Sequence, residues 1–166
     1  MTRRREGQRS GFSLVEVCFS TVITGVLLVS ALEVFRSSVL TGVQTARRGR
    51  ADALANDLLS EILSQPYVDT DGTGPLGYDS GESSVNRGDF DDVDDYHNWD
   101  ESPPQYKNGT TLTYLERWRR QVSVRYASAT DPNVNVGSDQ GLKRVTVTIS
   151  HQGAVLATAV GVRANI

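Results

Sequence analysis

This chain has few of the residues from which metal, redox and catalytic sites are usually built. Its 166 residues contain one cysteine, Cys18, and two histidines, His97 and His151. A lone cysteine cannot form an intramolecular disulfide, and so small a set of nitrogen and sulfur ligands argues against a zinc or redox site. The sequence also has no glycine-rich phosphate loop after a strand and no nucleophile–base pair. We therefore expect that the protein is not an enzyme.

Positive charge is scarce as well. The formal net charge is −3 at pH 7, whereas nucleic-acid binding needs a basic face. Four arginines and Glu6 give the first ten residues a net charge of +3, so the rest of the chain carries −6. We expect no nucleic-acid partner.

One long stretch is almost free of charge. From Phe12 to Phe35 only Glu16 and Glu33 are charged. At about 1.5 Å per residue, a helix of this length crosses the roughly 30 Å hydrocarbon core of a bilayer with some tilt. Four arginines precede the stretch, and such residues stay on the cytoplasmic side of a membrane. The sequence predicts a single transmembrane helix, with everything after Phe35 exported.

Glu16 is out of place in an ordinary membrane anchor. A carboxylate within a membrane helix costs about 2.5–3.5 kcal/mol on insertion scales, so it is usually functional or paired. Here it occupies the fifth position after a Gly11–Phe12 junction, behind a basic leader. In this combination the N-terminus resembles those of type IV prepilins and of the pseudopilins of type II secretion.

The resemblance implies a route of processing and assembly. In that family a prepilin peptidase cuts after the glycine, here Gly11, and methylates the new amino terminus, here Phe12. The glutamate, here Glu16, then pairs with the terminal amine of a neighbouring pilin-like subunit. The family also implies a single-pass protein of the bacterial inner membrane. Its N-terminus would be cytoplasmic, and its C-terminal domain would lie in the periplasm or in an extracytoplasmic filament.

Two other kinds of N-terminal segment share part of this pattern. A secretory signal peptide also has a basic start, but its apolar core runs about 7–15 residues and ends at a small-residue cleavage site. The apolar stretch here is longer and has no clear site of that kind behind it. A plain signal anchor stays open as an alternative, although it gives no reason for Glu16.

The expected fold is α+β and pilin-like, with one long N-terminal helix packed on a small antiparallel sheet of about three to four strands. Beyond the membrane stretch, apolar residues continue at three- and four-residue steps, which indicates an amphipathic continuation of the helix. Pro66 would end it. The chain then divides into five parts: a leader (1–11), a transmembrane helix (12–35), its amphipathic continuation (36–65), an acidic loop region (66–110) and the sheet (111–166).

Alternation of apolar and polar residues predicts the strands. The first runs to Tyr126 and starts near Trp118, because Glu116 and Arg120 interrupt its apolar face. A second passes through Val145 and Ile149, and a tight turn at Gln152–Gly153 leads into a third. One side of that last strand carries small residues that would let a helix approach closely: Ala157 and Ala159.

The region before the strands is strongly acidic. From Asp69 to Glu101, nine aspartates and two glutamates are opposed by Arg87 alone, which gives a net charge of −10. Its centre reads F-D-D-V-D-D-Y, which is similar to a phrase in minor pilin-like proteins, including one of the mannose-sensitive haemagglutinin pilus system. That similarity implies a minor subunit. Apolar residues recur there at three-residue spacing and are expected to turn inward while the carboxylates face out: Phe90, Val93, Tyr96 and Trp99.

Close like charges repel, so these carboxylates need a counter-charge or must stay in water. Calcium takes about six to eight oxygen ligands. The sequence offers such ligands in Asp69–Gly72 and in a central cluster: Asp89, Asp91, Asp92, Asp94 and Asp95. The alternative counter-charges are arginines of the strand region: Arg117, Arg119, Arg120 and Arg125. A third interpretation is a solvated acidic surface that contacts a partner protein.

Two functions are consistent with these patterns. The first is a minor pilin or pseudopilin, a structural subunit incorporated into or priming a type IV pilus-like or type II secretion filament after cleavage between Gly11 and Phe12. The second is a membrane-anchored exported binding protein whose acidic loop holds calcium or a protein partner. Cleavage after Gly11 would separate the two.

Overall fold

A computed structural model describes residues 11–68, 76–78 and 86–166 of the chain. Contacts within the chain divide it into two compact units, Met1–Gln44 and Thr45–Ile166, which we call the N-terminal unit and the sheet unit. The division falls inside residues 36–65, the stretch predicted as the amphipathic continuation of the helix.

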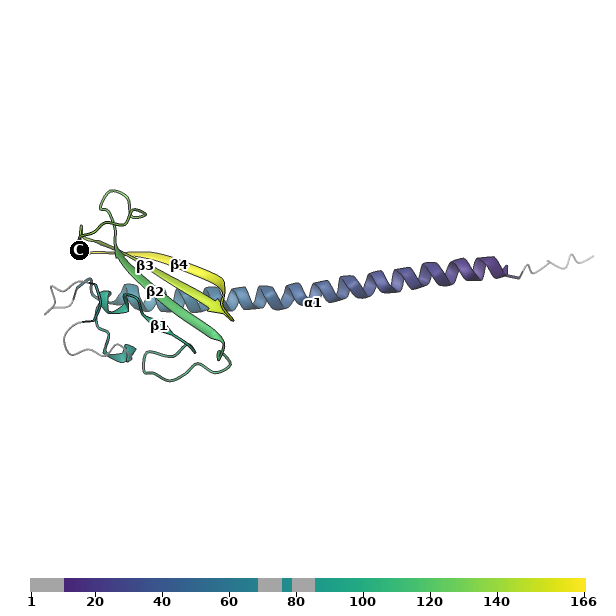
Figure 1. The fold of residues 1–166 in the computed structure, drawn as a ribbon, viewed down its shortest axis with the longest axis horizontal. Coiled ribbons are helices and arrows are strands. Elements are labelled where there is room, and N and C mark those ends of the chain that lie inside the picture. The colour runs from purple at the N-terminus through teal and green to yellow at the C-terminus, as the bar shows by residue number, and fades with distance from the viewer. Residues whose placement is uncertain (1–10, 69–75, 79–85) are drawn as a thin grey trace, which may run out of the picture. The chain divides into compact units, whose positions relative to one another are not determined.

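A single helix, α1 (Leu14–Ser64), runs through both units and lies close to the predicted bounds (Figure 1). Its residues are exposed throughout the N-terminal unit. In the sheet unit it has a buried face made of residues three and four positions apart, which therefore share one side of the helix. These residues are Ala51, Ala55, Leu58, Leu59 and Ile62. The pattern of burial thus agrees with the predicted change from an apolar to an amphipathic helix: one face of α1 is buried only in the sheet unit.

The sheet has four antiparallel strands in the order β1-β2-β3-β4. The strands are β1 (Asp100–Glu101), β2 (Trp118–Tyr126), β3 (Leu142–His151) and β4 (Ala154–Ala164). A long N-terminal helix on a small antiparallel sheet confirms the predicted α+β fold. Only β1 falls outside the region predicted as sheet. The β3–β4 turn has φ values of 52° at Gln152 and 82° at Gly153, as a tight two-residue hairpin requires.

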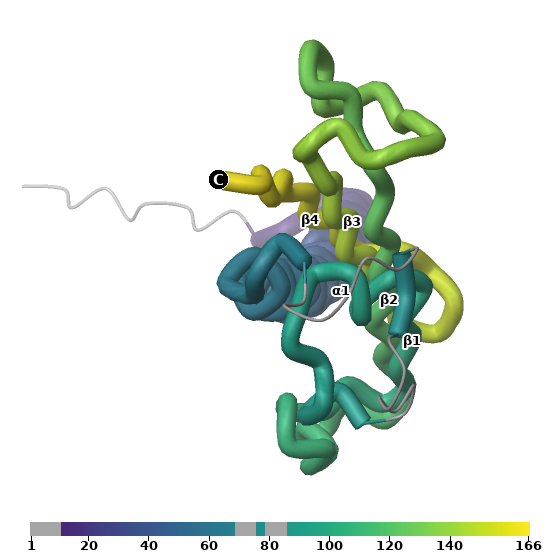
Figure 2. Tube along the Cα trace, turned by 90° about the vertical axis from the view of Figure 1, so that its left-hand side faces the viewer, coloured from purple at the N-terminus to yellow at the C-terminus, as the bar shows by residue number. Residues whose placement is uncertain are grey.

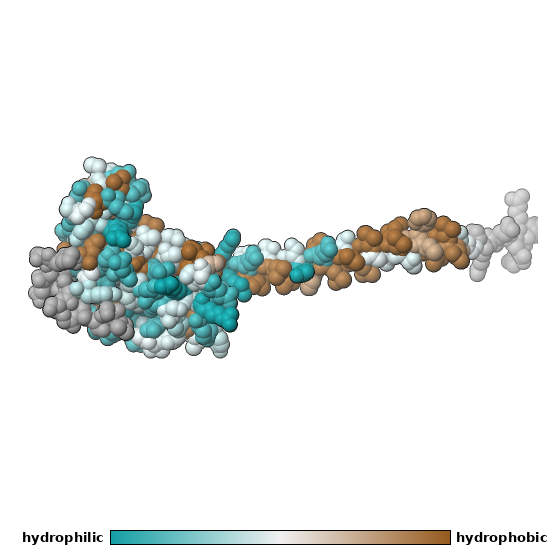
Figure 3. All heavy atoms as spheres, viewed as in Figure 1, coloured by the Kyte–Doolittle hydropathy of each residue, from teal (hydrophilic) through white to brown (hydrophobic). Residues whose placement is uncertain are grey.

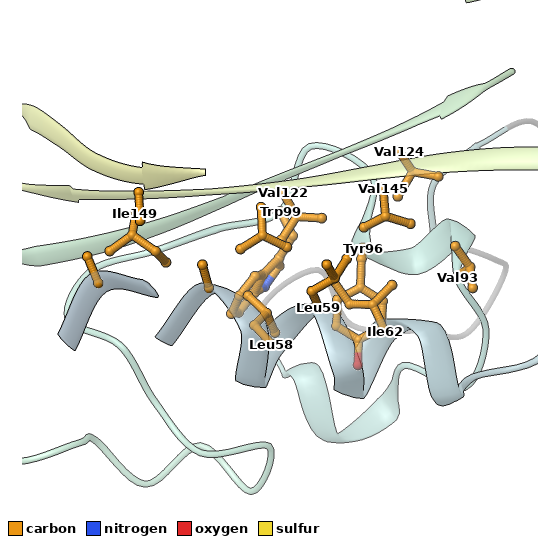
Figure 4. Packing of buried hydrophobic residues seen from close by; sticks show 14 of the residues in the cluster. Leu58, Leu59, Ile62, Val93, Tyr96, Trp99, Val122, Val124, Val145 and Ile149 are labelled. Atoms are coloured by element: carbon orange, nitrogen blue, oxygen red, sulfur yellow. The ribbon is translucent and has the colours of Figure 1, made fainter. Parts of the chain in front are cut away.

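The buried face of α1 packs on one face of the sheet (Figure 2). Alternate strand residues point into this core, among them Val122 and Val124 from β2 and Val145 from β3 (Figure 4). β4 approaches the helix through small residues, as predicted. A Cβ added to Gly161 would meet Leu63 Cδ1 at 2.7 Å and Leu59 Cδ1 at 3.2 Å, so a side chain at this position would have to push the two leucine side chains aside.

The acidic region contributes to the same core. It contains two short 3-10 helices, η1 (Arg87–Asp89) and η2 (Asp94–Tyr96). The four residues predicted to turn inward are all at most 5% exposed, which confirms that prediction: Phe90, Val93, Tyr96 and Trp99. The rings of Phe90, Tyr96 and Trp99 meet edge to face with centroids 5.0–6.5 Å apart, a geometry that aromatic pairs favour.

Candidate functional site

The Gly11–Phe12 junction lies in exposed, non-helical backbone just before α1. A Cβ on Gly11 would meet nothing within 4 Å, and Phe12 is 80% exposed. The first helical hydrogen bond nearby runs from Val17 N to Ser13 O, at 3.1 Å. Because no helical hydrogen bond has to open first, the peptide bond after Gly11 is presented in a form that a peptidase could bind.

Glu16 lies in the first turn of α1 and is exposed. A carboxylate is favoured at this end of a helix, where the unpaired backbone N–H groups carry partial positive charge. Phe12 precedes Glu16 by about one helical turn. The backbone nitrogen of Phe12 and the carboxylate of Glu16 are therefore about one turn apart at the start of the same helix, and both residues are exposed.

α1 is long and apolar enough to cross a membrane, with a mean hydropathy of 2.1 over its most apolar 18-residue window, and it lies near the N-terminus. Brown, hydrophobic residues dominate the N-terminal part of this helix in Figure 3. Among the described residues this is the one helix that meets these criteria. Cys18 is exposed and free on it.

The second candidate is the aspartate cluster of the acidic region, and its carboxylates do not all face outward as predicted. Asp92, Asp94 and Asp95 are 2–6% exposed. Asp92 Oδ1 accepts from the backbone N–H groups of Asp94 and Asp95, and Asp95 Oδ2 accepts from those of Asp91 and Asp92. These carboxylates hold together the turn that leads into η2, and the backbone N–H groups satisfy the buried oxygens.

Asp89, the fifth residue of the cluster, lies on the surface in η1. Among the described residues, no group of three or more histidine, cysteine, aspartate or glutamate side chains is placed to hold a metal ion. Asp69 and Asp71 lie outside the described residues. The geometry of the aspartate cluster gives calcium binding no support. Calcium binding therefore stays a prediction.

Lys143 supplies the counter-charge that the sequence analysis did not find. Its side chain is 1% exposed, and its Nζ lies 2.6 Å from Asp94 Oδ1. The same Nζ donates to the carbonyl of Tyr67 and stands 4.1 Å from the centroid of the Tyr67 ring. Lys143 therefore ties η2 and the segment that follows α1 to β3. The alternation along β3 could have indicated this role, because Lys143 has the same parity as Val145 and Val147 and therefore lies on the inward face.

A second ionic cluster joins the acidic region to α1 and β2. Arg120, 1% exposed, is paired with Glu101 through both Nε and Nη2. Arg87 lies 3.6 Å from Glu101 and 3.4 Å from Glu61 of α1, and Tyr96 donates to Glu61 at 2.8 Å. Burial raises the pKa of Glu101, and the two arginines oppose that shift.

The predicted role of arginines as counter-charges is therefore confirmed for two residues. Arg120 pairs with Glu101, and the exposed Arg119 pairs with Asp100. Arg117 and Arg125 take part in none of the ion pairs of the described residues. Arg87, the one positive charge within the acidic region, pairs with Glu101 as well.

Acidification is expected to stabilise the fold through Asp94. Burial raises the pKa of this carboxyl from 3.8 to about 6, although Lys143 opposes the shift; Asp92 and Asp139 add to it. The folded state thus binds the proton more tightly than the unfolded chain. The stabilisation from Asp94 is fully present below about pH 4 and is lost as the pH rises through about 6.

Thermal unfolding of the detergent-solubilised chain at pH 4 to 7 checks this expectation. The wild type should gain melting temperature, relative to Asp94→Asn, as the pH falls across this range, because the amide does not titrate. Parallel pH profiles for the two proteins would contradict the assignment.

Comparison with protein-family models, with curated proteins and with solved structures gives no match to this chain.

Proposed function

We propose that this protein is a minor pilin-like or pseudopilin-like subunit, a structural and non-enzymatic component of a type IV pilus-like or type II secretion filament. The observation that carries the proposal is the N-terminal constellation. A basic leader ends at an exposed Gly11–Phe12 junction, and a glutamate follows in the first turn of a helix apolar enough to span a membrane. The long helix on an antiparallel sheet supports it.

The same constellation gives the steps of maturation. The leader holds the N-terminus in the cytoplasm and the apolar part of α1 anchors the chain in the bacterial inner membrane, so that the sheet unit is exported. A prepilin peptidase cleaves after Gly11 and methylates the amine of Phe12. The carboxylate of Glu16 then pairs with the amine of an adjacent subunit, which compensates two charges that would each be costly in a membrane.

Mass spectrometry of the chain extracted from membranes tests this proposal. In cells that contain a prepilin peptidase, the first residue should be an N-methylated Phe12. Gly11→Leu should block the cleavage, because the bulky side chain would enter the peptidase site, whereas Gly11→Ala is the matched control and should be cleaved, at most more slowly. An intact Met1 terminus in such cells would refute the proposal.

The alternative is an exported binding protein that uses its acidic region for calcium or a protein partner. Nothing observed in the described residues specifically favours it. The buried carboxylates of that region serve hydrogen bonds and ion pairs within the chain. An unprocessed N-terminus would favour this alternative over the filament subunit.

A further inference from the structure

The two edges of the sheet are built differently. The edge strand β1 has only two residues, and both are acidic. The other edge strand, β4, has 11 residues (Figure 1). Its register against β3 is regular from Ala157 to Ala164, because the register shift lies next to Ser150. Natural edge strands are usually kept short, charged or bulged to prevent pairing, whereas this run carries one charge, on Arg163.

The hydrogen bonds show which backbone groups of β4 point to the open edge. Asn165 N donates to Gly141 O at 3.0 Å, so these two residues form a hydrogen-bonded pair. In an antiparallel ladder such pairs alternate with pairs whose N–H and C=O groups point away from each other. By this alternation Thr158, Val160 and Val162 point their backbone groups outward. Among the described residues, no hydrogen bond reaches these groups, so they are free to pair with a further strand.

The side chains along the open edge are apolar, although the same face of the sheet is polar on the next strand. Val160 and Val162 are 56% and 41% exposed. The residues opposite them on β3 are Thr146 and Arg144. A sheet face that meets only water is expected to carry polar side chains throughout. The two valines therefore fit contact with apolar side chains of an added strand.

Arg163 adds an uncompensated charge to this edge. Its Nε is buried without a hydrogen-bond partner, and Arg163 takes part in none of the ion pairs of the described residues. It stands opposite Lys143, which is already paired with Asp94. On a strand added at the open edge, the residue opposite Arg163 belongs to a pair without hydrogen bonds, in which side chains approach most closely. A carboxylate at that position compensates the guanidinium.

We propose that β4 accepts an additional strand from a different protein chain. The added strand pairs antiparallel with Thr158–Val162 and places a carboxylate opposite Arg163. Main-chain hydrogen bonds to a sheet edge, combined with side-chain contacts at alternate residues, are a common mode of peptide recognition. The partner segment is therefore extended, apolar at alternate positions and acidic near its own N-terminal end.

A second copy of this chain does not fit as the partner. Its β1 is too short to complete such a ladder. Two β4 strands that pair antiparallel turn one chain end over end relative to the other, because α1 packs on a face of the same sheet. Two chains anchored by α1 in one membrane cannot adopt that arrangement, and this step rests on the proposed function.

Hydrogen exchange of the detergent-solubilised full chain, resolved by NMR, tests the proposal. The probe is the peptide acetyl-Thr-Asp-Val-Thr-Val-Thr-Thr-amide. Without it, the amides of Val160 and Val162 should exchange fast, whereas the amide of Gly161 points to β3 and should be protected. Saturating peptide should slow exchange at Val160 and Val162 about tenfold or more. A control peptide with lysine in place of aspartate should bind about fivefold more weakly, since it faces Arg163 with a like charge.

Substitutions on β4 separate backbone pairing from side-chain contact. Val160→Pro removes an outward N–H, which an edge strand tolerates. It should keep the melting temperature close to that of the wild type and weaken peptide binding about tenfold. Val160→Thr keeps the N–H and a β-branched side chain, and it should bind the peptide about as tightly as the wild type. Ala159→Pro removes a hydrogen bond to β3 and should lower the melting temperature.

Three outcomes would overturn the proposal. They are unchanged exchange at Val160 and Val162 with peptide, unfolding or unweakened binding in Val160→Pro, and protection that rises with the concentration of the chain alone, which would identify a second copy as the occupant. Processing is read separately by mass spectrometry of the chain from cells. N-methylated Phe12 without peptide binding refutes this proposal alone, and an intact Met1 with peptide binding refutes the proposed function alone.

Discussion

Glu101→Leu is expected to lower the free energy of unfolding of the sheet unit by about 3–5 kcal/mol. Glu101 is shared by two buried arginines, Arg120 at 1% exposure and Arg87 at 4%. Without the carboxylate, the Arg120 guanidinium keeps the carbonyl of Gln105 as an acceptor but loses its counter-charge. An unpaired charge in the core costs more than the pair itself contributes, because its desolvation is no longer compensated.

The neighbouring residue gives a matched control. Asp100 pairs with Arg119 in the same two strands, but the side chains are 34% and 50% exposed. Asp100→Leu should therefore cost less than about 1 kcal/mol. Urea unfolding of both variants in detergent, followed by tryptophan fluorescence, compares the two pairs. Equal losses in the two variants would contradict the role given to burial.

The double variant Glu101→Leu/Arg120→Met separates the cost of an orphaned charge from the value of the pair. Apolar side chains of similar size can replace a buried ion pair at little or no cost, and Arg87 keeps Glu61 at 3.4 Å. The double variant is expected to be more stable than Glu101→Leu alone. Were it less stable, the ion pair would contribute more than the packing that replaces it.

The helix and the strands could be predicted because their signals are local. Steps of three and four residues from Ala51 to Ile62 describe one helix face, and alternation through Val145 and Ile149 describes one strand face. Both patterns depend only on backbone periodicity. β1 was missed because two residues, Asp100 and Glu101, are too few to show a period, and they are in a strand only through pairing with Gln121 and Arg120.

In the acidic region, local patterns could not predict which carboxylates are buried. Its apolar residues were placed correctly from their spacing, but its carboxylates were expected to face outward, with calcium, arginines or water as the compensation. Asp94 is buried opposite Lys143, which lies 49 positions later in the chain. The composition of the sequence around Asp94 cannot indicate a partner so far along the chain. The buried ion pairs could have been predicted from the strands, where the alternation places Lys143 and Arg120 at inward positions. A buried charge requires an opposite charge, and the acidic region was the available source.

The N-terminal motif presents the reverse case. Gly11, Phe12 and Glu16 were singled out from sequence alone, and the fold of the single chain places them in the open at the start of α1. Their proposed chemistry involves a peptidase and a second subunit. An isolated chain has no contacts that could identify those roles, so experiments on processing and assembly have to decide them.

Glu16→Leu is expected to abolish incorporation into filaments while leaving membrane insertion intact or improved. Removing a carboxylate from a membrane helix saves about 2.5–3.5 kcal/mol on insertion scales, so an ordinary anchor would gain from the change. Under the proposed function, the amine of Phe12 on the adjacent subunit loses its counter-ion and must be buried unpaired or left out. Membrane fractionation measures insertion, and recovery of the tagged chain in sheared filaments measures incorporation.

Glu33→Leu is the matched control for this prediction. Glu33 is the other carboxylate of the apolar stretch, but it lies near the far end, three residues before Arg36, where its side chain can reach water. It should insert and assemble like the wild type. Glu16→Asp keeps the charge on a shorter side chain, and it should assemble better than Glu16→Leu if the charge itself is what pairs. Normal incorporation of Glu16→Leu would show that Glu16 has another role and would remove the strongest support for charge pairing between subunits.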